Sequence, residues 1–262
     1  GQDLCPILED EGYDVVETDI YNMDFTNLSE VKNVIEKNMP DIVIHLGAYT
    51  NVDNAEDEPE KAYKINVEGT KNVSEICKKN NITLLYISTD YVFDGTKHTK
   101  YSTVDMPNPI NIYGKTKFEG EEAVKKCEKY YIIRTSWLYG HHGKNFVETM
   151  ISLVSQNKEI KVVDDQMGCP TWTVELANGI VKILAEEMPF GIYHVCGSGE
   201  TSWYGFAKEI FRLCDLNANI KPCTTNEFQR KAKRPKYSVM ENNKICRNWE
   251  SALKDYIDLR CE

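Results

Sequence analysis

The sequence predicts an α/β protein built on a doubly wound parallel sheet, with a smaller C-terminal lobe interleaved with it. Short apolar strands alternate with helices over the first part of the 262-residue chain. Such alternation implies right-handed βαβ crossovers and therefore parallel strands. The regular pattern breaks after about residue 140. We therefore expect one domain over 1–140 and, over 141–262, a lobe that is interleaved with the end of the first domain.

Local signals define the elements of the first part. Gly12 ends the first helix, Ser29 is expected to cap the second, and Pro40 stops it. The expected helices span 1–11, 29–39, 58–79 and 113–127, and the expected strands span 13–18, 41–46, 82–88 and 131–135. Ligands bind beyond the carboxyl ends of strands in such sheets. That rule predicts a site at the strand exits, which are 18–25, 46–53, 88–95 and 135–140.

The second part has longer helices and fewer strands. The expected helices span 144–157, 173–187 and 202–215, and the expected strands span 159–163 and 191–196. A basic segment follows at 230–236. Its arginines match phosphate geometry and would suit a diphosphate, but a solvated surface loop explains the segment equally well.

Composition excludes several classes of protein. The net charge is −10 with no basic stripe, which argues against binding nucleic acid or anionic membranes. The longest apolar stretches are only strand-sized, and no signal peptide is visible. The nine cysteines are widely spread without zinc-ligand spacing, which favours reduced thiols in a cytoplasmic protein. No metal site is predicted; a divalent ion between subunits is compatible with the sequence but has no support in it.

Tyr113 and Lys117 carry the clearest chemical signal. On a helix, a spacing of four residues places both side chains on one face, about one turn apart. A phenol titrates near pH ~10 in water, and an adjacent cation is expected to lower its pKa towards neutrality. Such a tyrosine can give a proton to a carbonyl oxygen that receives a hydride. A hydroxyl from Thr89 or Ser88, at the end of an earlier strand, would hold the same oxygen.

The N-terminus departs from the pattern expected of a Rossmann-like fold. Such folds open with a strand and a glycine-rich turn whose amides meet a pyrophosphate. This chain begins within the helix that normally follows that turn. A strand at the centre of a sheet leaves its neighbours unpaired when it is absent. We therefore expect that the natural first strand and glycine loop are missing from the sequence.

Six segments form a recognisable set of motifs, and they span 88–95, 113–121, 134–140, 165–171, 202–204 and 234–238. Together they resemble extended short-chain dehydrogenase/reductases, and more closely the dTDP-4-dehydrorhamnose reductase family. They cover nearly the whole chain in the family's order, and the combination is more specific than any single motif. The expected glycine motif is absent except for Gly1, and 238–249 is shorter than the family's usual stretch.

The resemblance implies a reaction and a set of site residues. Members of the family reduce the 4-keto group of dTDP-4-dehydro-L-rhamnose with a nicotinamide cofactor, NADPH or NADH. By this likeness Tyr113 is the proton donor, Lys117 lowers its pKa and grips the nicotinamide ribose, and Thr89 holds the keto oxygen. The likeness places Asp24, Phe25, Ala48, Tyr49, Thr50, Tyr113 and Lys117 at the cofactor, and Thr89, Asp90 and Trp137 at the sugar nucleotide. Trp137 is alternatively a core aromatic.

Other functions remain open on the same fold. A dehydratase would carry extra acids beside the catalytic hydroxyl, and the residue after Asp90 is Tyr91 rather than glutamate, which disfavours dehydration. Another sugar-nucleotide reductase, an epimerase or a non-catalytic regulatory subunit is compatible with the chain. Asp19 and Asp24 lie near the adenosine ribose and would repel a 2′-phosphate, which slightly favours NADH. The sequence gives no oligomeric state, and a homodimer is one that it allows.

Overall fold

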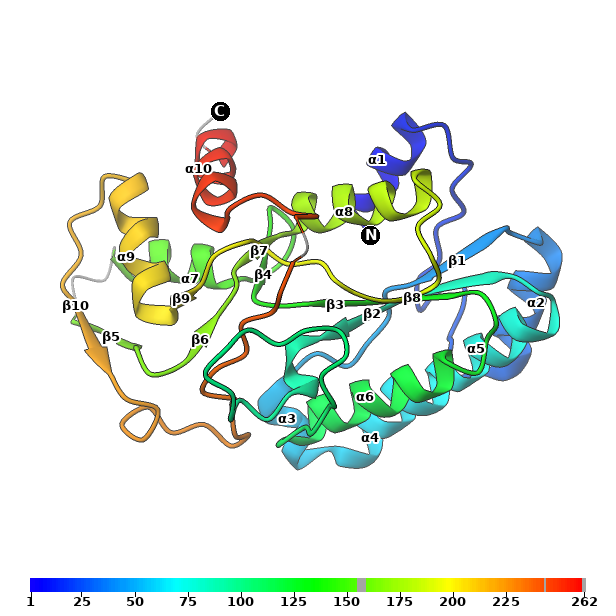
Figure 1. Cartoon of the computed structure of the whole chain (residues 1–262), viewed down its shortest axis with the longest axis horizontal. Coiled ribbons are helices and arrows are strands. Elements are labelled where there is room, and N and C mark those ends of the chain that lie inside the picture. Colours follow the sequence, from blue (N-terminus) through cyan, green and yellow to red (C-terminus); the bar gives the residue numbers. More distant parts are fainter. Residues whose placement is uncertain (155–158, 243, 261–262) are drawn as a thin grey trace.

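A computed structural model describes residues 1–154, 159–242 and 244–260. The central layer is a four-stranded sheet with helices on both faces, and a second lobe lies at one end of it (Figure 1). The sheet order is β1-β2-β3-β8, and every neighbouring pair is parallel. Its strands are β1 (Ile42–His45), β2 (Thr83–Thr89), β3 (Tyr130–Thr135) and β8 (Gly191–His194). The expected α/β fold with a parallel sheet is confirmed.

Alternate residues of the buried strands face opposite layers, as the pleat requires. Leu84 and Tyr86 pack with one set of helices, whereas Leu85 packs with the other. The first set contains α2 (Leu28–Asn38), α5 (Thr70–Lys79) and α6 (Ile112–Val124). The second contains α1 (Leu4–Asp10) and α8 (Thr173–Ala185), on the opposite face (Figure 1). Because both faces are covered, the central strands are apolar almost throughout.

The single helix expected over 58–79 is divided. Following α3 (Val52–Asp57), the structure has α4 (Pro59–Tyr63), a π-helical segment η1 (Lys64–Gly69) and then α5. A π segment widens the helix by one residue per turn and often lies at a functional site. Apolar periodicity could not reveal it, because the pattern continues through the bulge.

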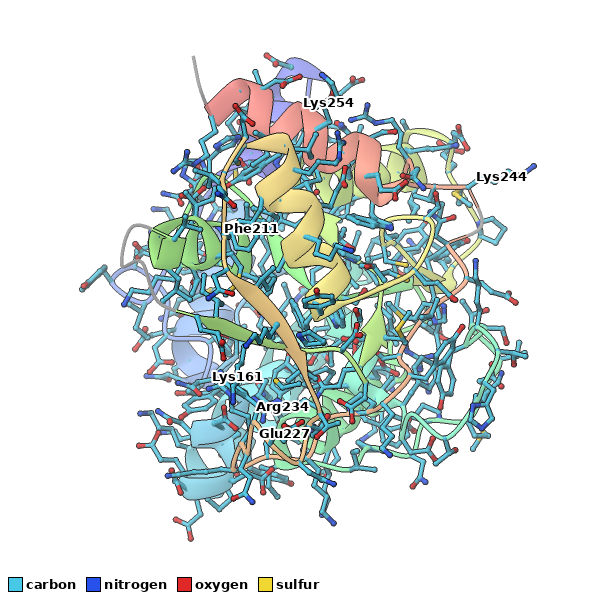
Figure 2. The ribbon with its side chains drawn as sticks, turned by 90° about the vertical axis from the view of Figure 1, so that its left-hand side faces the viewer. Lys161, Phe211, Glu227, Arg234, Lys244 and Lys254 are labelled. Carbon is cyan, nitrogen blue, oxygen red and sulfur yellow. The ribbon has the colours of Figure 1, made fainter. Side chains whose placement is uncertain are left out.

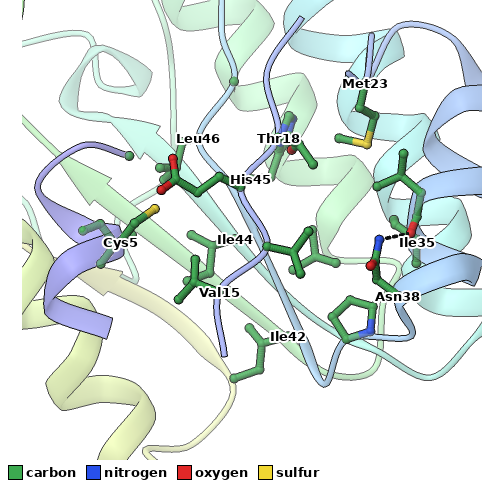
Figure 3. Close-up of a pocket in the computed structure, with 18 of the residues that line it drawn as sticks. Cys5, Val15, Thr18, Met23, Ile35, Asn38, Ile42, Ile44, His45 and Leu46 are labelled. Atoms are coloured by element: carbon green, nitrogen blue, oxygen red, sulfur yellow. Dashed lines mark hydrogen bonds between the residues drawn. The ribbon is translucent and has the colours of Figure 1, made fainter. Parts of the chain in front are cut away.

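The strand expected over 13–18 does not form, and this prediction was wrong. A strand needs a hydrogen-bonded neighbour, and this segment pairs with no other strand in the part of the chain that the structure describes. It lies near β1 instead, where Val15, Ile42 and Ile44 line an apolar cavity of about 410 Å³ (Figure 3). Whether a further strand and a glycine-rich turn belong to this fold stays a prediction.

The cap expected at Ser29 was also misplaced by two residues. Asn27 is the N-cap of α2, and its side chain accepts a hydrogen bond from the backbone N–H of Ser29 at 3.0 Å. Asparagine and serine are about equally good caps, so the pattern alone favoured neither.

The second lobe is built around α7 (Phe146–Val154), α9 (Trp203–Leu213) and α10 (Trp249–Arg260), with β5 (Ile160–Val163) parallel to β10 (Ile220–Cys223). Two further short pairs form separate two-stranded sheets: β4 (Leu138–Tyr139) is parallel to β7 (Thr171–Trp172), and β6 (Met167–Gly168) is antiparallel to β9 (Thr201–Ser202). The chain returns to the first sheet through α8 and β8, so the two parts are interleaved. The domain limits at 140 and 141 stay a prediction. Within the described ranges, every helix is too short or too polar to cross a membrane.

Candidate active site

The carboxyl ends of β2 and β3 bring the central residues of the site to one edge of the sheet. Thr89 ends β2 and lies opposite Thr135, the last residue of β3. Its hydroxyl accepts a hydrogen bond from the backbone N–H of Tyr91 at 3.2 Å, which caps the short 3-10 turn η2 (Asp90–Val92). The Thr89 side chain is therefore held in one place by the local turn.

Helix α6 approaches this turn unusually closely. Its N-cap, Asn111, accepts a hydrogen bond from the backbone N–H of Gly114 at 2.7 Å. A Cβ on Gly114 would lie 2.1 Å from the carbonyl oxygen of Tyr91, so only glycine permits this contact. The ring of Tyr113 consequently meets the ring of Tyr91 edge to face, with centroids 5.9 Å apart.

The phenol of Tyr113 interacts with the hydroxyl of Thr89. Burial raises the pKa of Tyr113 to about 12, the Thr89 hydroxyl lowers it and Asp90 raises it. The expected fall of this pKa towards neutrality is wrong for the structure without ligands. Desolvation of the phenolate outweighs any effect of the lysine one turn away.

Lys117 is the second unusual group, since its side chain is only 3% exposed. Its Nζ lies 4.0 Å from the ring centroid of Tyr86, a cation–π contact, and hydrogen-bonds to no side chain or carbonyl in the described part of the molecule. Burial lowers the pKa of Lys117 to about 7, while Glu121 raises it. An ammonium with unused donors fits the hydroxyls of a nicotinamide ribose. His45 lies close by, and burial together with Lys117 lowers its pKa to about 3.

Ser88 has a different partner from Thr89. Its hydroxyl donates to Oε1 of Glu121 at 2.6 Å, and the same carboxylate receives two hydrogen bonds from the guanidinium of Arg134, at 2.9 and 2.7 Å. Of the two hydroxyls considered for the keto oxygen, only that of Thr89 interacts with Tyr113.

Asp90 is buried directly after β2. Its Oδ1 lies 3.0 Å from Oγ1 of Thr89, and its Oδ2 accepts a hydrogen bond from Oγ of Ser238 at 2.6 Å. Burial raises the pKa of Asp90 to about 7, against the lowering effect of these two hydroxyls. Asp90 thus connects the end of β2 to the second lobe.

The expected cofactor residues Asp24 and Phe25 lie in the turn that precedes α2. The carboxylate of Asp24 accepts hydrogen bonds from the backbone N–H and hydroxyl of Thr26, so it organises this turn. Phe25 meets His45 edge to face at 4.9 Å. A Cβ on Gly47 would lie 2.5 Å from the Phe25 ring, which therefore packs directly over the exit of β1.

The loop after β1 is fastened by a residue that sequence reasoning missed. Asn66, fully buried in η1, accepts from the backbone N–H of Tyr49 at 2.7 Å and donates to its carbonyl at 3.1 Å. Its amide also donates to Oγ1 of Thr116 at 3.0 Å, beside Lys117. A lone asparagine between Ile65 and Val67 was the available signal.

The side chains of this loop differ in exposure. The hydroxyl of Tyr49 donates to Glu58 at 2.6 Å, and this bond raises its pKa to about 12. Ala48 is half-buried and Thr50 is exposed. The backbone of the loop, rather than its side chains, is what Asn66 positions.

Trp137 lies two residues beyond the end of β3 and is half-buried. It stacks on Trp203 with centroids 3.5 Å apart and an interplanar angle of 7°. Its φ of 47° is in the left-handed region, which is costly for a bulky residue. A Cβ on Gly168 would lie 2.4 Å from the indole, so Trp137 packs directly over that glycine. Strain of this kind gathers at ligand sites.

The basic segment, whose Arg234 is labelled in Figure 2, pairs with acidic residues of α3 in the first lobe. The guanidinium of Arg234 donates to both carboxylate oxygens of Asp53, at 2.6 and 2.9 Å. Lys231 pairs with Asp57. In this conformation the segment bridges the lobes instead of being a free loop.

The described ranges contain no cluster of three or more His, Cys, Asp or Glu side chains that could hold a metal ion. The eight cysteines within them are free thiols, while Cys261 lies outside.

Comparison with known proteins identifies the family. The sequence model of a protein family described as the RmlD substrate binding domain matches residues 1–260. The spore coat polysaccharide biosynthesis protein SpsK of Bacillus subtilis is 40% identical over 99% of this chain and 94% of its own length. A dTDP-4-dehydrorhamnose reductase from Clostridium acetobutylicum is 44% identical, with a TM-score of 0.97 over 100% of this chain and 96% of its own.

A second solved structure carries a cofactor. It is a dTDP-4-dehydrorhamnose reductase from Bacillus anthracis in complex with NADP, 42% identical with a TM-score of 0.95, covering 99% of this chain and 95% of that one. The likeness thus extends over the sheet, the site and the second lobe together. The chain belongs to the RmlD family of NAD(P)-dependent dTDP-sugar reductases.

Proposed function

We propose that this protein reduces the 4-keto group of dTDP-4-dehydro-L-rhamnose to give dTDP-L-rhamnose, with Tyr113 as the proton donor. The observation that carries the proposal is the contact between the phenol of Tyr113 and the hydroxyl of Thr89 at the carboxyl end of β2. Two solved dTDP-4-dehydrorhamnose reductases, 42% and 44% identical to this chain, support the choice of substrate.

The chemistry divides between cofactor and protein. The reduced nicotinamide supplies the hydride, and the protein supplies orientation and a proton. Tyr113 gives its proton to the oxygen that becomes the new hydroxyl, and Thr89 donates a hydrogen bond to the same oxygen. The pKa of about 12 keeps the phenol protonated until that oxygen becomes basic enough to take the proton.

Lys117 has two roles in this proposal. Its unused donors would hold the hydroxyls of the nicotinamide ribose. Its charge favours the tyrosinate that remains after proton transfer. Asp24, Phe25 and the loop 48–50 would line the cofactor site beyond it. Asp90 would act behind Thr89, and Trp137 would meet the sugar nucleotide from the opposite side.

Cofactor choice stays within the nicotinamides. Asp19 and Asp24 favour NADH by the charge argument, whereas the related structure from Bacillus anthracis holds NADP. Both are therefore included in the test. A dTDP-4-keto-6-deoxy-D-glucose reductase of Streptomyces niveus, 34% identical over 97% of this chain, gives a specific reason for a second candidate, a reductase that acts on a different sugar nucleotide.

The test follows the loss of absorbance of NADPH and of NADH with dTDP-4-dehydro-L-rhamnose. Tyr113→Phe removes the proton donor and keeps the ring, so turnover is expected to fall by a factor on the order of 10² or more. Tyr63→Phe, on an exposed tyrosine away from the site, is the matched control and should leave turnover unchanged. Equal turnover in Tyr113→Phe and wild type would remove Tyr113 from the mechanism.

A further inference from the structure

The carboxyl group of Asp90 is hydrogen-bonded to one hydroxyl from each of the two lobes. Its side chain is 2% exposed, and each carboxyl oxygen meets one hydroxyl: Oδ1 that of Thr89 and Oδ2 that of Ser238. Ser238 belongs to the second lobe, where its backbone N–H donates to the carbonyl of Met167 at 2.8 Å. Asp90 forms no ion pair with any residue that the structure describes.

The titratable groups that face Asp90 come from three directions. Tyr91, Tyr113 and Cys196 each have a pKa that is raised by the charge of Asp90. Arg234 lies beyond Tyr91 and is already paired with a carboxylate of α3. Burial raises the pKa of Asp90 to about 7, so both of its protonation states are accessible near neutral pH.

The number of hydrogens at Thr89 limits what it can bind. A hydroxyl has one hydrogen to donate, and an ionised carboxylate can only accept. While Asp90 is ionised, the Thr89 hydrogen points to Oδ1, and Oγ1 accepts from the N–H of Tyr91. A ketone oxygen also only accepts, so Thr89 cannot donate to it in that state. A protonated Asp90 can donate to Oγ1, which frees the Thr89 hydrogen.

We infer that Asp90 is a positioning residue that acts through Thr89: it holds the Thr89 hydrogen while ionised and releases it to the substrate carbonyl when protonated. This inference rests on the proposed reduction of a keto sugar. Ser238 sets the balance from the second lobe, because its hydroxyl stabilises the ionised carboxylate. Turnover therefore decreases when Asp90 loses its proton.

The first test compares pH profiles of kcat/KM for the keto sugar at saturating NADPH. Lys117 titrates in the same range as Asp90, so wild-type kcat/KM is expected to fall on the alkaline side with the loss of two protons. The asparagine in Asp90→Asn cannot titrate. The alkaline slope of log kcat/KM against pH should therefore be shallower in this variant by about one log unit per pH unit. Asp94→Asn is the matched control, since the pKa of Asp94 is lowered to about 2. An unchanged slope in Asp90→Asn overturns the inference.

The second test uses Ser238→Ala and needs no substrate. Removing a donor to the carboxylate raises the pKa of Asp90, because the ionised form loses a hydrogen bond. The infrared band of a buried carboxylic acid should disappear as pH rises through about 7 in wild type. It should persist to higher pH in Ser238→Ala and be absent in Asp90→Asn. A wild-type band that does not titrate, or one that Ser238→Ala leaves unmoved, overturns the inference.

The two tests separate this inference from the proposed function. Absence of turnover with either nicotinamide at every pH counts against the proposed reaction. The infrared titration is independent of turnover and decides whether Ser238 controls the proton on Asp90.

Discussion

Two sets of ionisable side chains are buried next to each other around α6, and only one of them is neutralised. Arg134 and Glu121 are 1% and 0% exposed and form a two-fold hydrogen-bonded ion pair. Lys117 and Asp90 are 3% and 2% exposed, and neither has an ion-pair partner among the residues that the structure describes. Burial is thus similar in the two sets, but charge compensation is not.

The difference separates a structural role from a chemical one. The compensated pair fixes β3 against α6 through its hydrogen bonds. Each uncompensated group has a pKa near neutrality and can exchange protons. Lys117 and Asp90 both have a pKa near 7, reached from opposite directions, because burial disfavours the charged form of each. Breaking the pair should therefore harm stability, and changing the unpaired groups should harm turnover.

The largest effect on stability is expected from Glu121→Gln. This change leaves the guanidinium of Arg134 buried without its counter-ion, which should cost about 3–5 kcal/mol of unfolding free energy. Denaturant unfolding gives the value. Glu122→Gln, on the exposed neighbour, should change it by less than about 0.5 kcal/mol. Equal effects of the two variants would show that the buried pair is not needed for stability.

Lys117→Met should reduce turnover without reducing stability, in contrast to Glu121→Gln. Turnover is expected to fall by a factor on the order of 10² or more, because the ribose and the tyrosinate lose their cation. The unfolding free energy at pH 7 should stay the same or increase, since an uncompensated buried ammonium is removed. Steady-state assays and denaturant unfolding of the same preparation measure both quantities. A loss of stability as large as that of Glu121→Gln would contradict the distinction between the two sets.

The pH dependence of Lys117 gives a further readout of that variant. The unfolded chain keeps the lysine proton up to a pKa of 10.5, and the folded chain releases it above about 7. Between these values the unfolded state binds more protons, so this group makes stability increase with pH. Lys117→Met should lack this contribution, which thermal unfolding between pH 7 and pH 10 would reveal.

Asp90→Asn should have the smallest effect on stability. Asp90 makes stability decrease with pH, which is opposite to the contribution of Lys117. The carboxyl has a pKa of 3.8 in the unfolded chain and about 7 in the folded one, so the folded state holds the proton over that window. Its stabilising contribution is complete below the lower value and is lost as pH rises through the upper one. The midpoint temperature of thermal unfolding should decrease less steeply from pH 4 to pH 8 in the variant than in wild type. A curve parallel to that of wild type would show that Asp90 does not titrate in this range.

Much of the sheet could be predicted because its strands are short apolar runs with clear ends. The expected strand over 82–88 and the observed β2 differ by one residue at each end, and α6 begins one residue before its predicted start. The segment 13–18 failed for a physical reason. Its β propensity is real, but a strand exists only when a neighbour accepts its hydrogen bonds.

The sequence predicted where the proposed site residues lie along the helix and the strand, but it did not predict the pKa of Tyr113. The spacing of Tyr113 and Lys117 gave their common helix, and the Ser-Thr exit of β2 gave the hydroxyl that meets the phenol. The lowered pKa of Tyr113 was not found, because the Lys117 ammonium lies against the ring of Tyr86 and burial dominates. The spacing of two residues in the sequence does not predict how deeply their side chains are buried.

The sequence by itself determined the alternation of strands and helices, the family resemblance and the side chains that we propose for the chemistry. These follow from local periodicity and from side-chain types, which are present in the chain before it folds. Only the tertiary structure decided which charges are paired and which are left alone, that Ser238 meets Asp90, and that Asn66 holds the loop after β1. Those contacts join residues far apart in the chain, and desolvation, which sets their protonation, exists only once the core has closed around them.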